Sequence, residues 1–235
     1  MQKTYAVICA RGGSKRVPGK NLAMLAGRPI LEYTVAAARE CGLFDDIVVN
    51  SDSEVILEVG AACGATPYRR PEALAGDKVF LIDVLREMIA AKNWPGDAVI
   101  AVLFPTAPLR AAQDIVKAHD LFMANGGNTP VVSVTPYEYP IQTALRLNEA
   151  GRLIPAMPEA YARSTRHNDH ETSYRATYAV IFNTAANFLT QRKLIGVDPI
   201  PCHLPPERSI DIDEPFQLLL AELLLKHGMP HERDG

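Results

Sequence analysis

Short apolar runs rich in Val and Ile alternate with longer segments of helical period as far as Thr135. The apolar runs predict buried strands at residues 5–10, 46–50, 98–103 and 131–134. The intervening segments carry apolar residues at helical spacing, at residues 30–38, 53–62, 79–91 and 112–123. This alternation predicts an α/β fold with a mainly parallel, Rossmann-like sheet and helices on both faces. Such sheets bind ligands at the carboxyl ends of their strands.

The alternation stops after Thr135. The next stretch is interrupted by Pro136, Pro140, Pro155 and Pro158. Its sequence fits a hairpin at residues 144–154 and a polar segment with Arg and His at residues 161–175. A strand at residues 177–182 and a tail helix at residues 214–227 are predicted to follow. We therefore expect one domain, residues 1–235, in which residues 137–175 form an insertion.

Composition limits the classes of partner and compartment. The 235 residues are 48% hydrophobic and 22% charged, which excludes a disordered chain. With 24 Lys and Arg against 27 Asp and Glu, the net charge of −3 disfavours non-specific binding to nucleic acid or to an anionic membrane. No apolar run reaches membrane-span length, and the run at residues 5–10 leads straight into Arg11, unlike a signal peptide. We expect a cytoplasmic protein whose scattered cysteines, Cys9, Cys41, Cys63 and Cys202, are reduced thiols.

A basic, glycine-containing loop follows the first predicted strand. Arg11, Lys15, Arg16 and Lys20 place four cations within ten residues, enough to balance a triphosphate. The adjacent glycines Gly12 and Gly13 let backbone N–H groups approach an anion. The loop is not a P-loop, because its glycines at positions 13 and 19 enclose five residues and Asn21 follows Lys20. The dinucleotide pattern G-x-G-x-x-G is absent as well, which disfavours a nicotinamide oxidoreductase.

Two carboxylates near the carboxyl end form a second candidate site. Asp211 and Asp213 are two residues apart, so in an extended segment both face one side while Ile210 and Ile212 face the other. Paired oxygen ligands suit Mg²⁺, which usually takes one or two carboxylates together with substrate phosphates. The alternative is an exposed acidic pair at a helix start, in which Asp213 caps the helix.

Four segments carry recognisable patterns: Ala10-Arg-Gly-Gly-Ser-Lys15 with Lys20-Asn21; Arg70-Pro71 with Leu74-Ala75 and Asp77; Pro105-Thr-Ala-Pro-Leu-Arg110; and Ser209-Ile-Asp-Ile-Asp213. In this order they resemble the loop signature, RP-x-x-LA-x-D, PTSPLR and S-x-DID of the cytidylyltransferases that activate sialic acids and related nine-carbon sugar acids. The resemblance runs from Val7 to about Leu224.

The resemblance implies a reaction in which CTP and a 2-keto sugar acid give a CMP-sugar and pyrophosphate, with Mg²⁺ as the cofactor. It also implies a homodimer joined through the insertion. It implies catalytic roles for Arg11, Lys20 and Asp211, and metal ligation by Asp211 and Asp213. It implies nucleotide binding by Ala10, Arg11, Gly12, Gly13, Ser14, Lys15, Lys20, Asn21 and Arg70. The sugar acid is expected to contact Arg166 and Arg175, because a carboxylate substrate calls for cations. The resemblance adds Arg110 and Gln142 to the residues that contact the sugar acid.

The identity of the sugar stays open among N-acylneuraminate, pseudaminate and legionaminate. The chain departs from the sialic acid branch at Phe104, at Gln142 and at Ala176-Thr-Tyr178. Tyr139-Pro-Ile-Gln142 resembles the FPIQ of the pseudaminic acid branch, and Thr165-Arg166 with Asp169 and Tyr174 resembles its TR-x-x-D-x-x-x-x-Y pattern.

Two alternatives remain. A cytidylyltransferase for the eight-carbon 3-deoxy-octulosonate would use a loop like ARYxSTRLPGKPL, whereas this chain has Gly-Gly-Ser-Lys15 followed by Lys20-Asn21. A non-catalytic nucleotide-binding regulator would lose the metal carboxylates, but Asp211 and Asp213 are both present.

Overall fold

The computed structural model describes residues 2–14, 17–163 and 170–228. These residues contain a seven-stranded sheet in the order β11-β7-β10-β6-β1-β4-β5. In chain order the strands are β1 (Thr4–Cys9), β4 (Asp46–Ser51), β5 (Thr66–Arg69), β6 (Val99–Val102), β7 (Val131–Pro136), β10 (Tyr174–Thr184) and β11 (Ile200–His203). β10 runs antiparallel to both of its neighbours, and the other pairings are parallel. The expected α/β fold with a mainly parallel sheet is confirmed.

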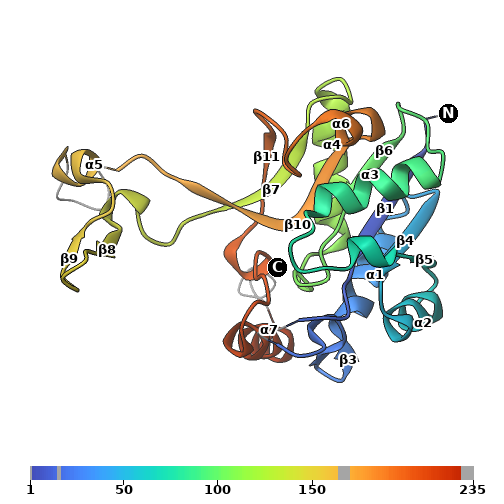
Figure 1. Cartoon of the computed structure of the whole chain (residues 1–235), viewed down its shortest axis with the longest axis horizontal. Coiled ribbons are helices and arrows are strands. Elements are labelled where there is room, and N and C mark those ends of the chain that lie inside the picture. Colours follow the sequence, from blue (N-terminus) through green and yellow to red (C-terminus); the bar gives the residue numbers. More distant parts are fainter. Residues whose placement is uncertain (1, 15–16, 164–169, 229–235) are drawn as a thin grey trace.

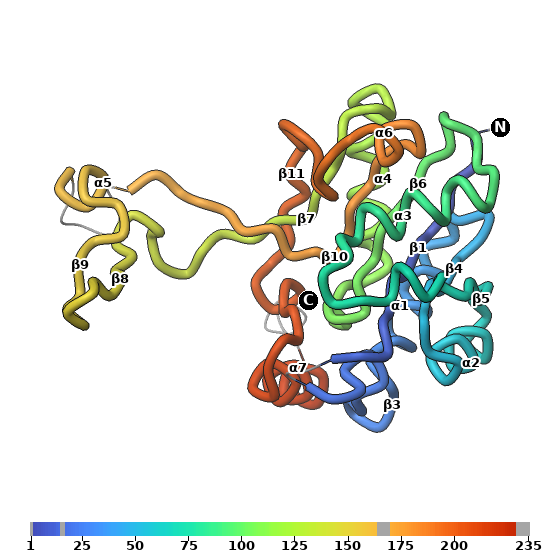
Figure 2. Tube along the Cα trace, in the orientation of Figure 1, coloured from blue at the N-terminus to red at the C-terminus, as the bar shows by residue number. Residues whose placement is uncertain are grey.

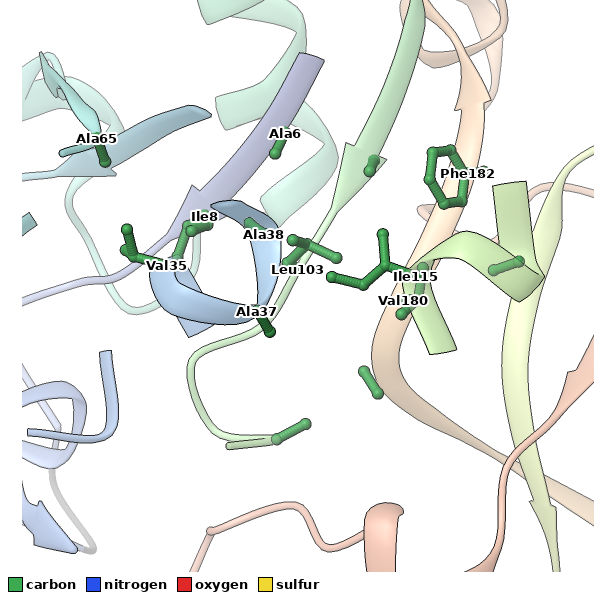
Figure 3. Packing of buried hydrophobic residues seen from close by; sticks show 14 of the residues in the cluster. Ala6, Ile8, Val35, Ala37, Ala38, Ala65, Leu103, Ile115, Val180 and Phe182 are labelled. Atoms are coloured by element: carbon green, nitrogen blue, oxygen red, sulfur yellow. The ribbon is translucent and has the colours of Figure 1, made fainter. Parts of the chain in front are cut away.

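Helices cover both faces of the sheet, because consecutive residues of its buried strands point to opposite sides. Ala6 and Ile8 of β1 pack with the helices α1 (Ile30–Glu40), α2 (Glu54–Ala62) and α4 (Ala112–Ala124). Figure 3 shows part of this layer, where Ile8, Val35, Leu103 and Ile115 gather beside the sheet. Val7 instead belongs to the cluster formed with α3 (Leu81–Ala91) and α6 (Ala185–Thr190).

A third apolar cluster holds the acidic segment near the carboxyl end. The helix α7 (Pro215–His227) buries Ala221 against Leu25 of the short pair β2 (Met24–Leu25) and β3 (Arg28–Pro29). Ile210 and Ile212 are 9% and 0% exposed in the same cluster. The segment between them and α7 is thereby fixed on the body of the protein.

The residues between β7 and β10 leave the sheet and project to one side (Figure 1). They form a 3-10 helix η3 (Ile141–Thr143), the hairpin β8 (Leu145–Leu147) and β9 (Leu153–Pro155), and the helix α5 (Pro158–Arg163). The tube in Figure 2 shows two long connecting stretches that join this part to the body. The predicted hairpin is present. We call residues 137–173 the arm, and Arg175, expected in the insertion, lies on β10 instead.

The sequence reading missed the two edge strands. β5 and β11 contain Pro67 and Pro201, and proline argues against a strand in a sequence pattern. An edge strand tolerates it, since one side of the strand has no neighbour to which it must donate. Ser53 precedes α2 as expected, but its side chain makes no capping hydrogen bond. Within the described residues no helix is long and apolar enough to cross a membrane.

Candidate active site

The predicted phosphate loop and two other motifs meet at a cleft of about 270 Å³ beyond the carboxyl end of β1. Arg11, Lys20 and Asn21 of the loop line it together with Arg70. The end of β6 contributes Phe104, Pro105 and Thr106 to the same wall. Segments far apart in the sequence are therefore brought together where a parallel sheet is expected to bind its ligand.

The loop is held in place by its own backbone and by β4. Ala10 N–H donates to the Asn50 carbonyl at 3.0 Å, and the Asn21 amide donates to the Arg11 carbonyl at 2.9 Å. Gly12 N–H donates to Asp52 at 2.9 Å, so this N–H is already used by the protein rather than open to a phosphate. A Cβ at Gly12 would lie 3.0 Å from that of Ser53, which explains the need for glycine at this close approach. Of the other expected loop residues, Gly13 borders open space, Ser14 is half-buried, and Lys15 lies outside the described residues.

Two loop cations pair with carboxylates across the cleft. Arg11 Nη1 lies 2.6 Å from Asp77 Oδ1, and Lys20 Nζ lies 2.9 Å from Asp213 Oδ1. The Arg11 and Asp77 side chains are 41% and 47% exposed, so water screens their attraction and the pair contributes little to stability. An incoming polyphosphate can compete for such cations. Asp77 belongs to the motif recognised in the sequence, but no role had been assigned to it.

Arg70 is buried, and Asn50 orients it. Its Nε donates to the Asn50 side-chain oxygen at 2.8 Å and its Nη2 to the Asn50 carbonyl at 3.1 Å. Asn50 is itself 0% exposed. Asn50 does not line the cleft but supports Arg70.

Asp211 and Asp213 extend the site beyond Thr106. Ile212 N–H donates to the Thr106 carbonyl at 2.7 Å. Ile210 and Ile212, on either side of Asp211, are buried, which confirms the predicted division of the segment into an apolar and an acidic face. Asp213 does not cap α7. The residue preceding that helix is Glu214, whose N–H donates to the Gln217 side chain at 2.7 Å.

The electrostatic environment of Asp211 disfavours its charged form. Burial raises the pKa of Asp211, and the like charge of Asp213 raises it further. A hydrogen bond with Thr106 and the charges of Lys20 and Arg175 act in the opposite direction. Oδ1 of Asp211 is buried and has no hydrogen-bond partner among the described residues. Such an oxygen suits a cation supplied with the substrate.

The comparisons with known proteins agree with this geometry. The family model described as "Cytidylyltransferase" matches residues 5–149, more than half of the chain. The chain belongs to the cytidylyltransferase family. Its activity is therefore of the nucleotidyltransferase class, and the predicted resemblance is confirmed.

Curated relatives match almost the full length of this cytidylyltransferase. It is 32% identical over 228 residues to the pseudaminic acid cytidylyltransferase of Campylobacter jejuni, covering 95% of this chain and 97% of the relative. It is 30% identical over 229 residues to the CMP-N,N'-diacetyllegionaminic acid synthase of Legionella pneumophila, with the same coverage of each chain. An N-acylneuraminate cytidylyltransferase of Escherichia coli is 29% identical over 93% of this chain but only 51% of its own length.

Solved structures support the fold. A CMP:2-keto-3-deoxy-manno-octonic acid synthetase complexed with CTP superposes with a TM-score of 0.70 at 15% identity, covering 97% of this chain and 100% of the other. A 4-diphosphocytidyl-2C-methyl-D-erythritol synthase gives a TM-score of 0.68 at 12% identity, with coverage of 96% and 100%. At such identities the likeness is one of fold.

The remaining expected substrate residues of this cytidylyltransferase are scattered. Arg175 donates from Nη2 to the Ser209 carbonyl at 3.1 Å and acts on Asp211, so it lies at the rim of the site. Gln142 lies in the arm, is not among the residues that line the cleft, and donates to the Glu171 carbonyl at 3.2 Å. Arg166 lies outside the described residues.

Arg110 does not have the position expected of a substrate ligand. It is 3% exposed, and burial lowers its pKa to about 9. Its guanidinium donates to the Ala179, Phe104 and Ala107 carbonyls at 2.9, 2.7 and 3.1 Å, and to the Thr34 hydroxyl at 3.0 Å. The protein uses the fork of this side chain itself, which accounts for an arginine at the end of the PTAPLR motif without any substrate contact.

Sequence reasoning gave no role to several residues of the cleft. Phe104 was noted only as a departure from the sialic acid branch, yet its ring lies 5.2 Å from that of Tyr178. Cys9 lines the cleft floor, where burial raises the pKa of its thiol to about 11, so it is not a nucleophile at neutral pH. No motif carries Cys9, and only the fold brings this residue to the cleft.

The raised pKa of Asp211 predicts that this carboxylate costs stability at neutral pH. A carboxyl with a raised folded-state pKa stabilises the fold below its ordinary pKa of 3.8, and that stabilisation is lost as the pH rises through the folded-state value. Asp211→Asn should therefore raise the melting temperature at pH 7 and give no gain below about pH 3.8. Asp120→Asn, at a side chain that is 73% exposed, is the control and should change little. A lower melting temperature for Asp211→Asn at pH 7 contradicts this account.

The structural part played by Arg110 gives a second prediction. Arg110→Lys cannot reach all the acceptors, and each buried carbonyl left without a donor costs about 1–3 kcal/mol. We expect a loss of about 3 kcal/mol in the free energy of unfolding, measured with urea. Arg28→Lys, which alters a half-exposed pair with Glu32, should cost less than about 1 kcal/mol. Unchanged stability of Arg110→Lys together with a raised KM for an acceptor would restore Arg110 as a substrate ligand.

Proposed function

We propose that this protein transfers CMP from CTP to a nine-carbon, sialic acid-like 2-keto sugar acid. The observation that carries the proposal is the meeting of the loop cations with the Asp211 segment at one cleft. The relatives support the acceptor class, because three of them are named for pseudaminic, N,N'-diacetyllegionaminic and N-acylneuraminic acid. The proposed acceptor is thus a nonulosonic acid.

The reaction balances without an enzyme-bound intermediate. The oxygen of the anomeric hydroxyl attacks the α-phosphorus of CTP, the bond from that phosphorus to the bridging oxygen breaks, and pyrophosphate leaves. The hydroxyl proton passes to water. Arg11 and Lys20 stabilise the charge that grows on the departing phosphates, since preorganised cations act where charge develops. Arg70, already oriented by Asn50, is pre-positioned for the nucleotide.

At the other end of the site, Arg175 is the residue that we assign to binding of the sugar carboxylate. It lies on β10 next to Ser209 and within electrostatic reach of Asp211. This position lets it receive a carboxylate beside the reacting hydroxyl. Arg166 is proposed as a second such cation on the evidence of sequence alone.

The residues present fit a magnesium ion. The described residues contain no group of three or more His, Cys, Asp and Glu side chains suited to a metal, so an all-protein cage is not available there. Asp211 offers a buried oxygen without a hydrogen-bond partner, and Asp213 adjoins it. These two carboxylates would hold Mg²⁺ together with substrate phosphates, the arrangement that this ion favours. When bound, the ion supplies charge stabilisation to the phosphoryl groups.

Pyrophosphate release tests the reaction directly. The protein is assayed with each of the four nucleoside triphosphates against a panel of eight- and nine-carbon keto acids. We expect turnover with CTP and a nine-carbon acid. Turnover confined to 3-deoxy-octulosonate would establish the eight-carbon alternative, and binding of CTP without release of pyrophosphate under any condition would indicate a regulator.

Lys20→Ala should lower kcat/KM for CTP at least about 100-fold, or ~2.7 kcal/mol, whereas Lys3→Ala, at an exposed pair with Asp45, should not.

We propose further that the active protein is a homodimer joined through the arm. Leu145, Leu147 and Leu153 lie on one face of the β8–β9 hairpin, because Leu147 pairs with Leu153 and Leu145 is two residues away. They are 49%, 65% and 65% exposed. A two-stranded hairpin has no core of its own, so a second copy is the economical way to cover these leucines.

Sedimentation at micromolar concentration measures the oligomeric state. We expect a species of twice 25.7 kDa, and we expect Leu147→Glu to convert it to the monomer. Arg146→Glu, on the opposite face of the same strand, is the control and should leave the dimer intact. A wild-type protein that sediments only as the monomer contradicts the proposal.

A further inference from the structure

Two aromatic rings meet at the edge of the cleft where the chain departs from the sialic acid branch. Phe104 follows β6, and Tyr178 lies on the neighbouring strand β10. Their ring centroids are 5.2 Å apart and the planes are inclined by 44°. Phe104 lines the cleft beside Thr106, and both rings are only partly buried. Phe104 presents aromatic surface to this end of the site, and the Tyr178 ring packs beside it.

The backbone at Tyr178 is strained. Its φ of 55° lies in the left-handed region, which residues with a side chain seldom adopt. The strand register explains how this arises: Ala176 pairs with Val134 and Ile181 with Val132, so the residues between them bulge out of β10. A bulge of this kind re-aims side chains and is frequent next to active sites.

Buried side chains hold the bulge in this conformation. The Ser133 hydroxyl oxygen accepts from Val180 N–H at 2.9 Å and from the Thr177 hydroxyl at 2.7 Å. Arg110 donates to the Ala179 carbonyl at 2.9 Å and to the carbonyl of Phe104 at 2.7 Å, so one guanidinium binds Phe104 and the residue that follows Tyr178. Strain that is maintained by so many buried contacts is typical of a ligand-binding position.

The order of strands places the pair at the acceptor end of the cleft. Arg70 follows β5, the phosphate loop follows β1, and Phe104 and Tyr178 come from β6 and β10, on the other side of β1. Tyr178 shares its strand with Arg175, the cation assigned above to the sugar carboxylate. The aromatic pair therefore adjoins the position of the sugar acid, if the loop holds the phosphates.

Resting on the proposed function, we infer that Phe104 and Tyr178 form an apolar wall of the acceptor site. This wall favours sugar acids in which a methyl or acyl group takes the place of a hydroxyl group. A methyl group against the rings leaves water without losing a hydrogen bond. A hydroxyl at the same place loses its hydrogen bonds to water, and the ring faces offer no equivalent partner. Discrimination by one such group is typically about 10–200-fold.

The test compares kcat/KM for three acceptors at saturating CTP. They are N-acetylneuraminate, its analogue with a methyl in place of the terminal hydroxymethyl group, and its analogue with an acetamido group in place of the C7 hydroxyl. We expect the wild type to favour at least one analogue over the parent by about 10-fold or more. Phe104→Gln and Tyr178→Asn should each reduce that ratio several-fold, and asparagine tolerates the left-handed backbone at position 178. Tyr178→Phe, which keeps the ring, should preserve the ratio.

The ratio is taken within one preparation, so partial loss of folding or of CTP binding cancels. Tyr5→Leu is the control for loss of an aromatic pair elsewhere, since Tyr5 stacks on Trp94 at 4.2 Å and neither residue lines the cleft. This variant should leave the ratio unchanged. Equal use of all three acceptors by the wild type, or a preference that persists in both Phe104→Gln and Tyr178→Asn, contradicts the inference of an apolar wall. Neither result contradicts the proposed function. Absence of turnover with any nine-carbon acid contradicts the proposed function and this inference together.

Discussion

A single buried guanidinium connects the parts of the chain that form one side of the active site. Arg110 binds the loop after β6 through the Phe104 and Ala107 carbonyls, the bulge of β10 through Ala179, and α1 through Thr34. Burying a charge is costly unless its hydrogen bonds are satisfied. With a pKa of about 9 the group is still protonated at neutral pH, and its several acceptors offset the loss of water. Because these acceptors come from distant segments, the guanidinium is satisfied only when all of them are in place.

The position of Asp211 follows from that arrangement. The loop fixed by Arg110 presents the Thr106 carbonyl, which receives Ile212 N–H, while the two isoleucines enter the apolar cluster beneath α7. The carboxylate is thereby held at the cleft in a partly dehydrated position, where its charged form is disfavoured. An oxygen without a hydrogen-bond partner in that position is unfavourable for the protein alone. It is suited to a site completed by the substrate and its cation.

The loop cations are also arranged to exchange one partner for another when the substrate binds. Arg11 and Lys20 are paired with Asp77 and Asp213, so the cleft holds charges of both signs before any ligand arrives. These pairs are partly open to water and contribute little to stability, which leaves the cations available to phosphates. Arg70 differs, because its burial against Asn50 keeps it in one position. The cleft therefore combines exchangeable cations with a fixed one.

The amino-acid sequence predicts the alternation of strands and helices, the basic loop after β1, and the two faces of the acidic segment. These are local properties, since helical period, strand period and glycine spacing act over a few residues. It could not reveal that Arg110 supports the site from within, that Asn50 orients Arg70, or that Phe104 meets Tyr178. Each of these depends on contacts between residues that are 20 to 76 positions apart, and on a bulge whose strain no propensity favours. Only the tertiary structure decides such contacts, because burial and strand register determine which polar groups must find partners and which side chains reach the cleft.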